Sequence, residues 1–293
     1  PLTFNPGYEV IFSPIYGFNL QDNFMQNDKG EWEVAWTSDL AKDYITYMHK
    51  LYEDGLLDQS WSTNDGTSVG TKIANDTVGM TMGWSWSASF EFSAAYDEYD
   101  GTKGIFDLMV PVKAPNGKQF YRGVDCFYGI TRNCEHPDLV FAMMDYLFQD
   151  DMVKLANLGI KGVDWDEDAN GNITIDEALL NDEAHASELG TNPRCVPFEQ
   201  NVVAIDPQFP KWHQEENAVI RNYIESPLIW TAANDEDQAI YDQYYTDVNK
   251  YWWEEITKFV AGTESLDNWD SYVQHCKDMG QDKLLEVFLN SQK

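Results

Sequence analysis

Two tryptophans that follow a short strand-like segment are the residues whose type and spacing point most directly to chemistry. Val78, Met80 and Met82 alternate with small or polar residues, which predicts a strand with one buried face. Trp84 and Trp86 come next, two residues apart and mixed with serines. Flat apolar rings with a polar N–H edge fit a sugar, which presents C–H groups on one face and hydroxyls around its rim. The alternative interpretation is that both indoles belong to the hydrophobic core.

A second candidate site is the segment from Asp166 to Glu177, which matches the calcium-binding loop consensus position by position. Oxygen-bearing side chains fall at positions 1, 3 and 5, a glycine at 6, a hydrophobic residue at 8 and a glutamate at 12. The metal-ligating candidates are Asp166, Asp168, Asn170, Asn172 and Glu177. The alternative is a β-hairpin, in which Val163–Trp165 pairs with Ile173–Ile175 around a turn of Asp, Asn and Gly residues.

Motifs of the common enzyme classes do not occur in this sequence. There is no nucleophile elbow, no zinc-protease H-E-x-x-H, no phosphate loop and no dinucleotide fingerprint. The four cysteines include no C-x-x-C pair, so no structural zinc site is predicted. Nothing in the spacing singles out a pair of carboxylates of the glycosidase type among the 50 acidic residues.

The composition allows a large core and excludes two classes of partner. Hydrophobic residues make up 43% of the 293-residue chain and aromatic residues 14%, so one large domain or two smaller ones can fold and still present rings to a ligand. The formal net charge is −31. Such a surface repels the phosphates of nucleic acid and of anionic membranes, although solubility alone also explains the acidity.

The elements that must position these residues are short strands alternating with helices, which is typical of α/β layers. Ser38 is expected to cap a helix that runs to Glu53, with an apolar stripe of Leu40, Tyr44, Tyr47, Met48 and Leu51. A long helix is expected from Pro137 to Gly159, with a buried face of Val140, Met143, Met144, Leu147, Phe148, Met152 and Leu155. Further helices are predicted from Asp235 to Gly262, from Ser265 or Asp267 to Gly280, and over Lys283–Leu289. Strands are predicted at 77–83, 106–112 and 126–131.

Several stretches resemble the extracellular solute-binding proteins of ABC importers, of the maltose-binding type. The resemblance lies in Asn75–Trp86, Gly104–Gly129 and Glu135–Ala142. A closer resemblance is to the lipoprotein subgroup of Gram-positive gut bacteria, because Leu51–Asp58 and Phe259–Val273 are similar to recurring segments of that subgroup. In this family the segment 166–177 usually forms a glycine-turn hairpin.

The resemblance implies an α/β, helix-rich, two-lobed periplasmic-binding-protein-like fold of the class II type, incomplete at its N-terminus. Residues 1–108 would belong mainly to lobe 2, with Trp84. Residues 109–190 would form mainly the return segment of lobe 1, with the hairpin at 163–177. Residues 191–293 would form a lobe-crossing loop and the C-terminal helices.

The resemblance also assigns roles to individual residues. Trp84 matches the cleft tryptophan of the family, and Trp86 could reach either the cleft or the core. The other ligand-binding candidates are Arg122, Asp125, Tyr128 and Trp230. Polar groups at 122–128 would bond sugar hydroxyls, although Arg122 and Asp125 could instead form a surface ion pair and Trp230 could be a packing residue.

The resemblance implies that the protein is the substrate-binding component of an ABC transporter and not an enzyme. It would bind a carbohydrate, with an oligosaccharide as the first candidate, in a cleft between the two lobes. The expected partners are the ligand and the membrane permease, with no nucleic acid, and the protein is expected to be a monomer. The full-length protein would be extracellular and anchored by an N-terminal lipid. No cofactor is required, and calcium is the candidate metal. The alternatives are a glycoside hydrolase and a calcium-dependent surface glycan-binding module.

Overall fold

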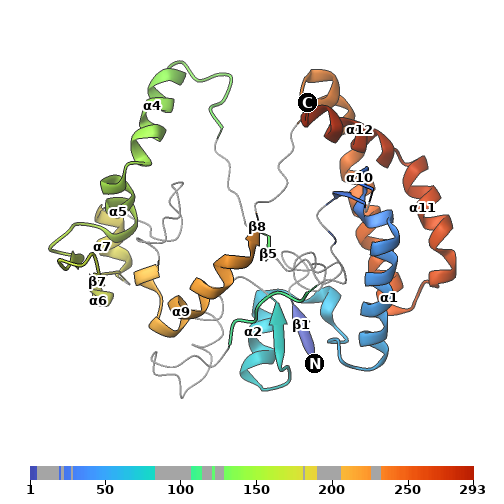
Figure 1. Cartoon of the computed structure of the whole chain (residues 1–293), viewed down its shortest axis with the longest axis horizontal. Helices are drawn as coiled ribbons and strands as arrows, with labels where there is room; N and C mark the ends of the chain where they lie inside the picture. Colours follow the sequence, from blue (N-terminus) through green and yellow to red (C-terminus); the bar gives the residue numbers. More distant parts are fainter. Residues whose placement is uncertain are drawn as a thin grey trace. The chain divides into compact units, whose positions relative to one another are not determined.

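The computed structural model describes residues 1–4, 20, 23–27, 29–82, 107–113, 121–122, 129–180, 182–189, 206–225 and 232–293 (Figure 1). Internal contacts divide the chain into two units. Unit 1 consists of Pro1–Asp97, Leu108–Gly123 and Val219–Lys293, and unit 2 consists of Glu98–Asp107 and Val124–Ala218. The assignment of residues 1–108, 109–190 and 191–293 to lobes stays a prediction.

Unit 1 is built around helices from both ends of the chain. Its main helices are α1 (Asp39–Glu53), α10 (Asp235–Ala261), α11 (Trp269–Asp278) and α12 (Gln281–Ser291), coloured blue and orange to red in Figure 1. Helix α10 packs against α1, α11 and α12. The shorter helices are α2 (Gly66–Ala74) and the 3-10 helices η2 (Ala35–Thr37), η3 (Trp61–Thr63), η7 (Arg221–Tyr223) and η8 (Leu266–Asn268).

Capping residues read from the sequence set the limits of these helices. The Ser38 hydroxyl accepts the N–H of Ala41 at 3.1 Å, which satisfies a free donor at the start of α1. At the start of α10, the Asn234 side chain accepts the N–H of Asp237 at 2.9 Å. Gly262 ends α10 in the left-handed conformation, with φ +71°. The predicted helices at 39–53 and from Asp235 are therefore confirmed.

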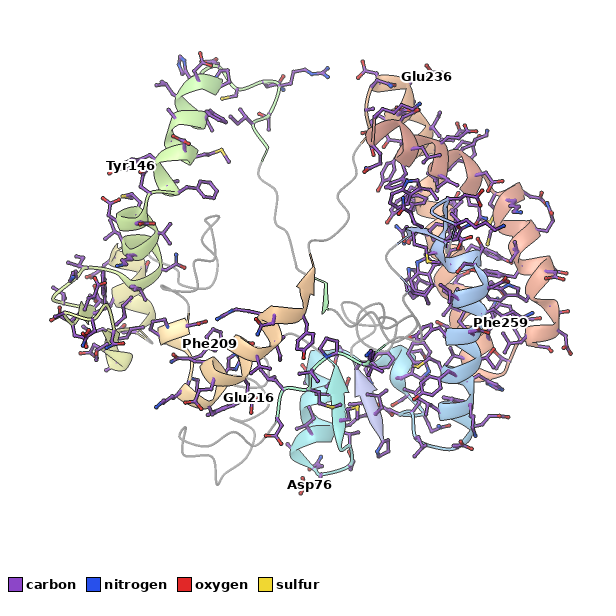
Figure 2. The ribbon with its side chains drawn as sticks, viewed as in Figure 1. Asp76, Tyr146, Phe209, Glu216, Glu236 and Phe259 are labelled. Carbon is purple, nitrogen blue, oxygen red and sulfur yellow. The ribbon has the colours of Figure 1, made fainter. Side chains whose placement is uncertain are left out.

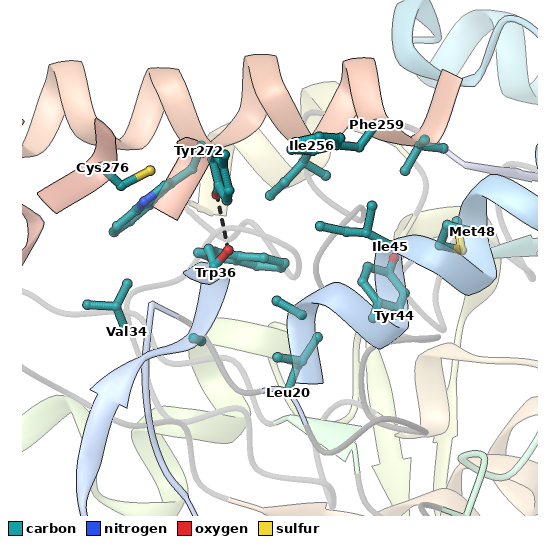
Figure 3. Close-up of a cluster of buried hydrophobic side chains, with 14 of the residues drawn as sticks. Leu20, Val34, Trp36, Tyr44, Ile45, Met48, Ile256, Phe259, Tyr272 and Cys276 are labelled. Atoms are coloured by element: carbon teal, nitrogen blue, oxygen red, sulfur yellow. Dashed lines mark hydrogen bonds between the residues drawn. The ribbon is translucent and has the colours of Figure 1, made fainter. Parts of the chain in front are cut away.

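A single aromatic-rich core holds unit 1 together. Trp36 and Trp252 are its largest fully buried side chains. The Tyr272 hydroxyl on α11 donates a hydrogen bond of 3.1 Å to the carbonyl oxygen of Trp36, drawn dashed in Figure 3. The same core includes Phe4 and Trp61, whose ring centroids are 5.4 Å apart. It therefore extends from the helices to the first strand of the chain.

The inward face of α1 differs in part from the predicted stripe. Tyr44 and Met48 are buried as expected, but Tyr47 is 44% exposed. Ala41 and Ile45 are fully buried. Residues four apart share a helix face, so Ala41 and Ile45 lie on one line and Tyr44 and Met48 on the next, whereas Tyr47 points away from both.

The described strands of unit 1 form three two-stranded sheets. Strands β1 (Leu2–Phe4) and β4 (Met80–Met82) are parallel, β2 (Phe24–Gln26) and β3 (Trp32–Val34) are antiparallel, and β5 (Tyr121–Arg122) and β8 (Ile224–Glu225) are parallel. Strand β4 begins at Met80, three residues later than the predicted strand at 77–83, and Met80 is 47% exposed rather than buried. Residues 107–113 contain no strand, which corrects the prediction for 106–112.

Unit 2 is smaller, and the core among its described residues is small. It contains α4 (Pro137–Leu147), α5 (Asp150–Leu158), β6 (Trp165–Glu167), β7 (Ile173–Ile175), α6 (Glu177–Leu180), α7 (Glu183–Leu189), the 3-10 helix η6 (Asp206–Gln208) and most of α9 (Lys211–Ile220). The buried cluster among its described residues is Val153, Leu158 and Trp165, with Ile173 and Ile175 packed on it.

The long helix expected from Pro137 to Gly159 is instead two helices, α4 and α5, and the prediction of its buried face was wrong. Of the predicted face, Met143 is 55% exposed, Phe148 49% and Leu155 42%. None of the residues of α4, all of which are described, is buried. The apolar periodicity indicated that one face of this segment packs against another element, but it did not indicate whether that element lies within the chain.

Phe288 tests the unit 1 core. Its ring stacks on Phe24 at a centroid distance of 4.7 Å and meets the edge of Trp32 at the same distance. We expect Phe288→Ala to lower the free energy of unfolding by about 3–5 kcal/mol, because it removes buried area and leaves a cavity. Denaturant unfolding followed by circular dichroism measures the loss. Asp43→Ala, at an exposed position of α1, should change stability by less than about 0.5 kcal/mol, and equal losses in the two variants would contradict the assignment of this core.

Candidate functional site

Most of the predicted ligand-binding residues lie outside the described residues. These are Trp84, Trp86, Asp125, Tyr128 and Trp230. Arg122 lies in β5, where the structure describes its backbone position only. What the structure describes of this candidate site is therefore the strands that precede these residues in the chain.

Those strands share one geometric property: each belongs to a parallel pair. Strand β4 ends two residues before Trp84, and it pairs with β1 in the register Leu2 to Met80. Strand β5 ends at Arg122, and it pairs with β8 in the register Arg122 to Glu225. Parallel strands end at the same edge of a sheet, so Arg122 and Glu225 end the β5–β8 pair at one edge, before Asp125 and Trp230 in the sequence. The carboxyl ends of parallel strands are the usual ligand-binding edge of open α/β sheets.

A polar network fixes the strand pair that leads to Trp84. Asp58 Oδ2 accepts hydrogen bonds from Thr3 Oγ1 at 2.7 Å, from Asn64 Nδ2 at 2.9 Å and from Lys72 Nζ at 2.6 Å. Thr3 lies in β1 opposite Thr81 of β4, and the other partners lie in the turn before α2 and in α2 itself. The network therefore joins the strand pair to α2 and to the turn that follows α1.

Sequence reasoning missed this network. Asp58 closes the quoted segment Leu51–Asp58, but no role was assigned to it. Lys72 also donates to Ser60 Oγ and to Asn64 Oδ1, at 2.6 Å each. One feature of the sequence could have revealed the network: Asp58 directly follows Leu56 and Leu57 at the end of an apolar turn. A carboxylate beside buried residues needs a nearby cation.

The network also sets the ionisation of Asp58. Burial by itself raises the pKa of this carboxyl group, but hydrogen bonds from Asn64, Lys72 and Thr3 act in the opposite direction and together outweigh it. The pKa of Asp58 therefore lies well below its usual range. The side chain of Asp58 is 11% exposed and that of Lys72 25%, so the pair is only weakly screened by solvent.

The segment 166–177 forms a hairpin in unit 2. Strands β6 and β7 are antiparallel, in the register Trp165 to Ile175, so the first strand is Trp165–Glu167 rather than the expected Val163–Trp165. At the turn, Asp168 Oδ1 accepts the backbone N–H groups of Asn170 and Asn172 at 2.8 and 2.9 Å. Gly171 has φ +84°, a conformation that favours glycine. These bonds correspond to the hairpin interpretation of the sequence.

The donor chemistry of this loop suits calcium, whose ligands are carboxylate, amide and carbonyl oxygens. In the described arrangement, however, Asp168 Oδ2 also accepts Asn172 Nδ2 at 2.8 Å, and the Asn172 carbonyl oxygen accepts the Asp168 N–H at 3.0 Å. Within the part of the chain that the structure describes, no three His, Cys, Asp or Glu side chains form a metal-holding group. The side chain of Glu177 lies outside the described residues. Calcium binding at Asp166, Asp168, Asn170, Asn172 and Glu177 stays a prediction.

Charged side chains fasten the hairpin to its unit. Glu167 accepts from Lys154 on α5 at 3.3 Å and from Lys161 at 3.1 Å, and these bonds lower the pKa of Glu167. The buried Asp164 accepts the N–H of Ile160 at 2.6 Å and pairs with His185 on α7 at 2.5 Å. The hairpin is thus held from α5 and from α7.

Comparison with solved structures defines the fold class of the chain. The alginate-binding protein AlgQ2, solved without calcium ion, matches 99% of this chain with a TM-score of 0.69 and 19% identity. The ABC-transporter substrate-binding protein FusA of S. pneumoniae, in complex with kestose, matches 100% of it with a TM-score of 0.66 and 16% identity. The predicted α/β, two-lobed periplasmic-binding-protein-like fold class is thereby confirmed.

The family follows from the sequence. The profile of the bacterial extracellular solute-binding proteins matches residues 6–154, just over half of the chain, and the chain belongs to that family. It is 21% identical over 265 residues to lipoprotein LipO of Bacillus subtilis (strain 168), a match that covers 88% of this chain. The chain spans 52% of LipO, 63% of AlgQ2 and 62% of FusA. No helix among the described residues combines the length and the apolarity needed to cross a bilayer.

Asp58→Asn tests the polar network. The substitution leaves the ammonium group of Lys72 without its anionic partner, so we expect a loss of about 2–3 kcal/mol in the free energy of unfolding at pH 7, as for hydrogen bonds to a charged group. Because the folded-state pKa of Asp58 is lowered, the stabilisation is present above the unfolded-state pKa of about 3.9 and is lost as the pH falls through the folded-state value. The variant should therefore lose less stability than the natural chain between about pH 5 and pH 2.

Asp54→Asn is the matched control, because Asp54 is 46% exposed and pairs with Lys50 on the surface. It should change stability by less than about 1 kcal/mol. Urea unfolding across this pH range measures both variants. Parallel pH profiles for the natural chain and Asp58→Asn would show that Asp58 does not have the assigned ionisation.

Proposed function

We propose that this protein is the substrate-binding component of an ABC importer, and that it binds an oligosaccharide between two lobes without altering it chemically. The observation that carries the proposal is the likeness of fold over 99–100% of the chain to two proteins whose names include saccharides, alginate and kestose. Membership of the extracellular solute-binding family supports it. The family and these relatives are binding proteins, and the binding role without catalysis is therefore proposed for this chain.

In the proposed site, aromatic rings and polar groups make different contributions to saccharide binding. Trp84 and Trp86 supply flat apolar area, and Trp230 is a third candidate ring. Arg122, Asp125 and Tyr128 orient the hydroxyls by hydrogen bonds, since a few placed polar groups give a mostly apolar site its specificity. The parallel pairs β1–β4 and β5–β8 lead into the segments that carry these residues.

Signalling to a transporter follows from two-state closure. A ligand that contacts both lobes stabilises the closed form by its extra contacts there, and the permease recognises that form. The proposed partners are therefore the oligosaccharide and the membrane permease, with the protein acting as a monomer. The lipoprotein relative supports an extracellular protein that is held at the membrane by an N-terminal lipid on the full-length polypeptide.

Trp84→Ala tests the proposed site. A thermal-shift screen against alginate, fructan and other oligosaccharides first identifies the best ligand, and calorimetry then measures its affinity. We expect Trp84→Ala to weaken binding by about 1–3 kcal/mol, the loss typical of a central stacked ring. Trp84→Phe keeps an aromatic face and should retain most of the affinity. Asp43→Ala, at an exposed position of α1, should bind as the natural chain does, and unchanged affinity in Trp84→Ala would remove Trp84 from the site.

We also propose that the loop 166–177 binds calcium as a structural ion. Asp168 would then exchange its bond with Asn172 Nδ2 for the metal. Support comes from the loop consensus and from the names of two solved relatives, AlgQ2 without calcium ion and an EF-hand mutant of FusA.

Chelation tests this second proposal. An ion that binds only the folded state stabilises it by about 2.7 kcal/mol at a hundredfold excess over Kd. The melting temperature should therefore rise with calcium and fall with EGTA, and the calcium-dependent difference should vanish in Asp168→Ala. Asp145→Ala, at an exposed carboxylate of α4, should keep that difference. The same melting curve with calcium and with EGTA would exclude the site.

A further inference from the structure

Two lysines lie directly against the candidate calcium loop, residues 166–177. Lys154 Nζ on α5 is 3.3 Å from Glu167 Oε2, and Lys161 Nζ is 3.1 Å from the same oxygen. Figure 2 draws the side chains of this part of unit 2 at the position where Figure 1 labels α5 and β7. Glu167 is the second residue of the loop and lies between two of its candidate ligands.

The carboxylate of Glu167 brings these charges close to the turn of the loop. Glu167 Oε1 is 3.9 Å from the position that a Cβ atom would take at Gly171, a residue of that turn. Both ammonium groups also lie against the ring of Trp165, since Lys154 Nζ is 5.6 Å and Lys161 Nζ 5.3 Å from its centroid. Two positive charges therefore meet one negative charge here, which leaves an excess of positive charge beside the loop.

Positive charge beside a calcium loop weakens its affinity for the ion. Asp166, Asp168 and Glu177 are the candidate ligands that carry negative charge, and the charge count of the ligands is one of the factors that tune calcium affinity. Neighbouring charges that are not ligands add to this count through Coulomb's law. At separations of about 6–10 Å, one unit charge changes the affinity for a divalent ion by about two- to tenfold once screening is included.

We propose that Lys154 and Lys161 set the calcium affinity of the loop by weakening it, and that they keep its Kd near the values of about 10⁻⁴–10⁻³ M that are typical of extracellular modules. This inference rests on the proposed calcium site. The two lysines then have opposite effects in the two states of the loop. Without calcium they stabilise the hairpin by bonding Glu167, and with calcium their charge opposes the ion.

Lys161→Met in the full 293-residue chain separates these two effects. The Lys161 side chain is 53% exposed, so its replacement disturbs little packing, and methionine keeps an apolar contact with the Trp165 ring. We expect the melting temperature in EGTA to fall slightly, because one ion pair is lost. Calorimetry should nevertheless show calcium binding about two- to tenfold tighter than in the natural chain. Lys154→Met should change both quantities in the same directions.

Three further variants control for the charge. Lys161→Arg keeps the positive charge and should keep the natural calcium affinity. Lys250→Met removes a lysine that pairs with Glu254 on α10 of unit 1, and should also bind calcium as the natural chain does. Glu167→Gln leaves both ammonium groups without their carboxylate and should weaken calcium binding. The differences between these variants should shrink as the KCl concentration rises from about 20 to about 500 mM.

The outcomes distinguish this inference from the proposals on which it builds. Calcium affinity that is unchanged or lower in both lysine-to-methionine variants would overturn the inference and leave the calcium site in place, because the lysines would then act only as a structural clamp. An absence of saturable calcium binding in the natural chain and in every variant would overturn the inference and the calcium site together. Saccharide binding is measured separately, so the transporter role is tested independently of both.

Discussion

The burial of aromatic side chains between α1, α10, α11 and α12 is the interaction on which the rest of unit 1 depends. It joins parts of the chain that are far apart in sequence, since Tyr272 and Trp36 are 236 residues apart and share a hydrogen bond. Gln281 extends the same connection, because its side chain bonds both Trp252 and Thr37. Contacts of such long range are costly in chain entropy, so only a large buried area can maintain them.

This core also determines where the candidate site can form. Phe4 belongs to it and lies in β1, so the strand pair β1–β4 is anchored to the helices. The network of Asp58, Lys72 and Thr3 fixes the same pair from its polar side. The segment that carries Trp84 thus leaves a strand held by both apolar and ionic contacts. A binding site on a rigid edge loses less entropy when the ligand is ordered, which favours affinity.

The sequence predicted the elements that local chemistry determines. Ser38 and Gly262 mark helix ends through hydrogen bonds and backbone geometry within a few residues, and both were identified correctly. The fold class came from resemblance and was confirmed by solved structures. The hairpin was one of two alternatives, because the same Asp, Asn and Gly residues suit a turn and a calcium loop.

The remaining features depend on tertiary partners that local patterns do not encode. Periodicity predicted a buried face for 137–159, but the partner of α4 is not among the described residues of unit 2, and the helix is exposed. The Asp58 network joins residues from four segments, so no short motif reveals it. The candidate ligand residues, apart from Arg122, lie outside the described residues, and their roles rest on the family resemblance and on the strands that precede them.

Of the properties that we propose for this protein, the first to test is that it binds a saccharide and leaves it intact. The most direct measurement titrates the purified protein with a defined oligosaccharide in a calorimeter and then analyses the recovered sugar by mass spectrometry. We expect a saturable heat that corresponds to one ligand per chain, and a sugar of unchanged length and mass after prolonged incubation. Shortened sugar products, or no saturable binding to any oligosaccharide class, would contradict it.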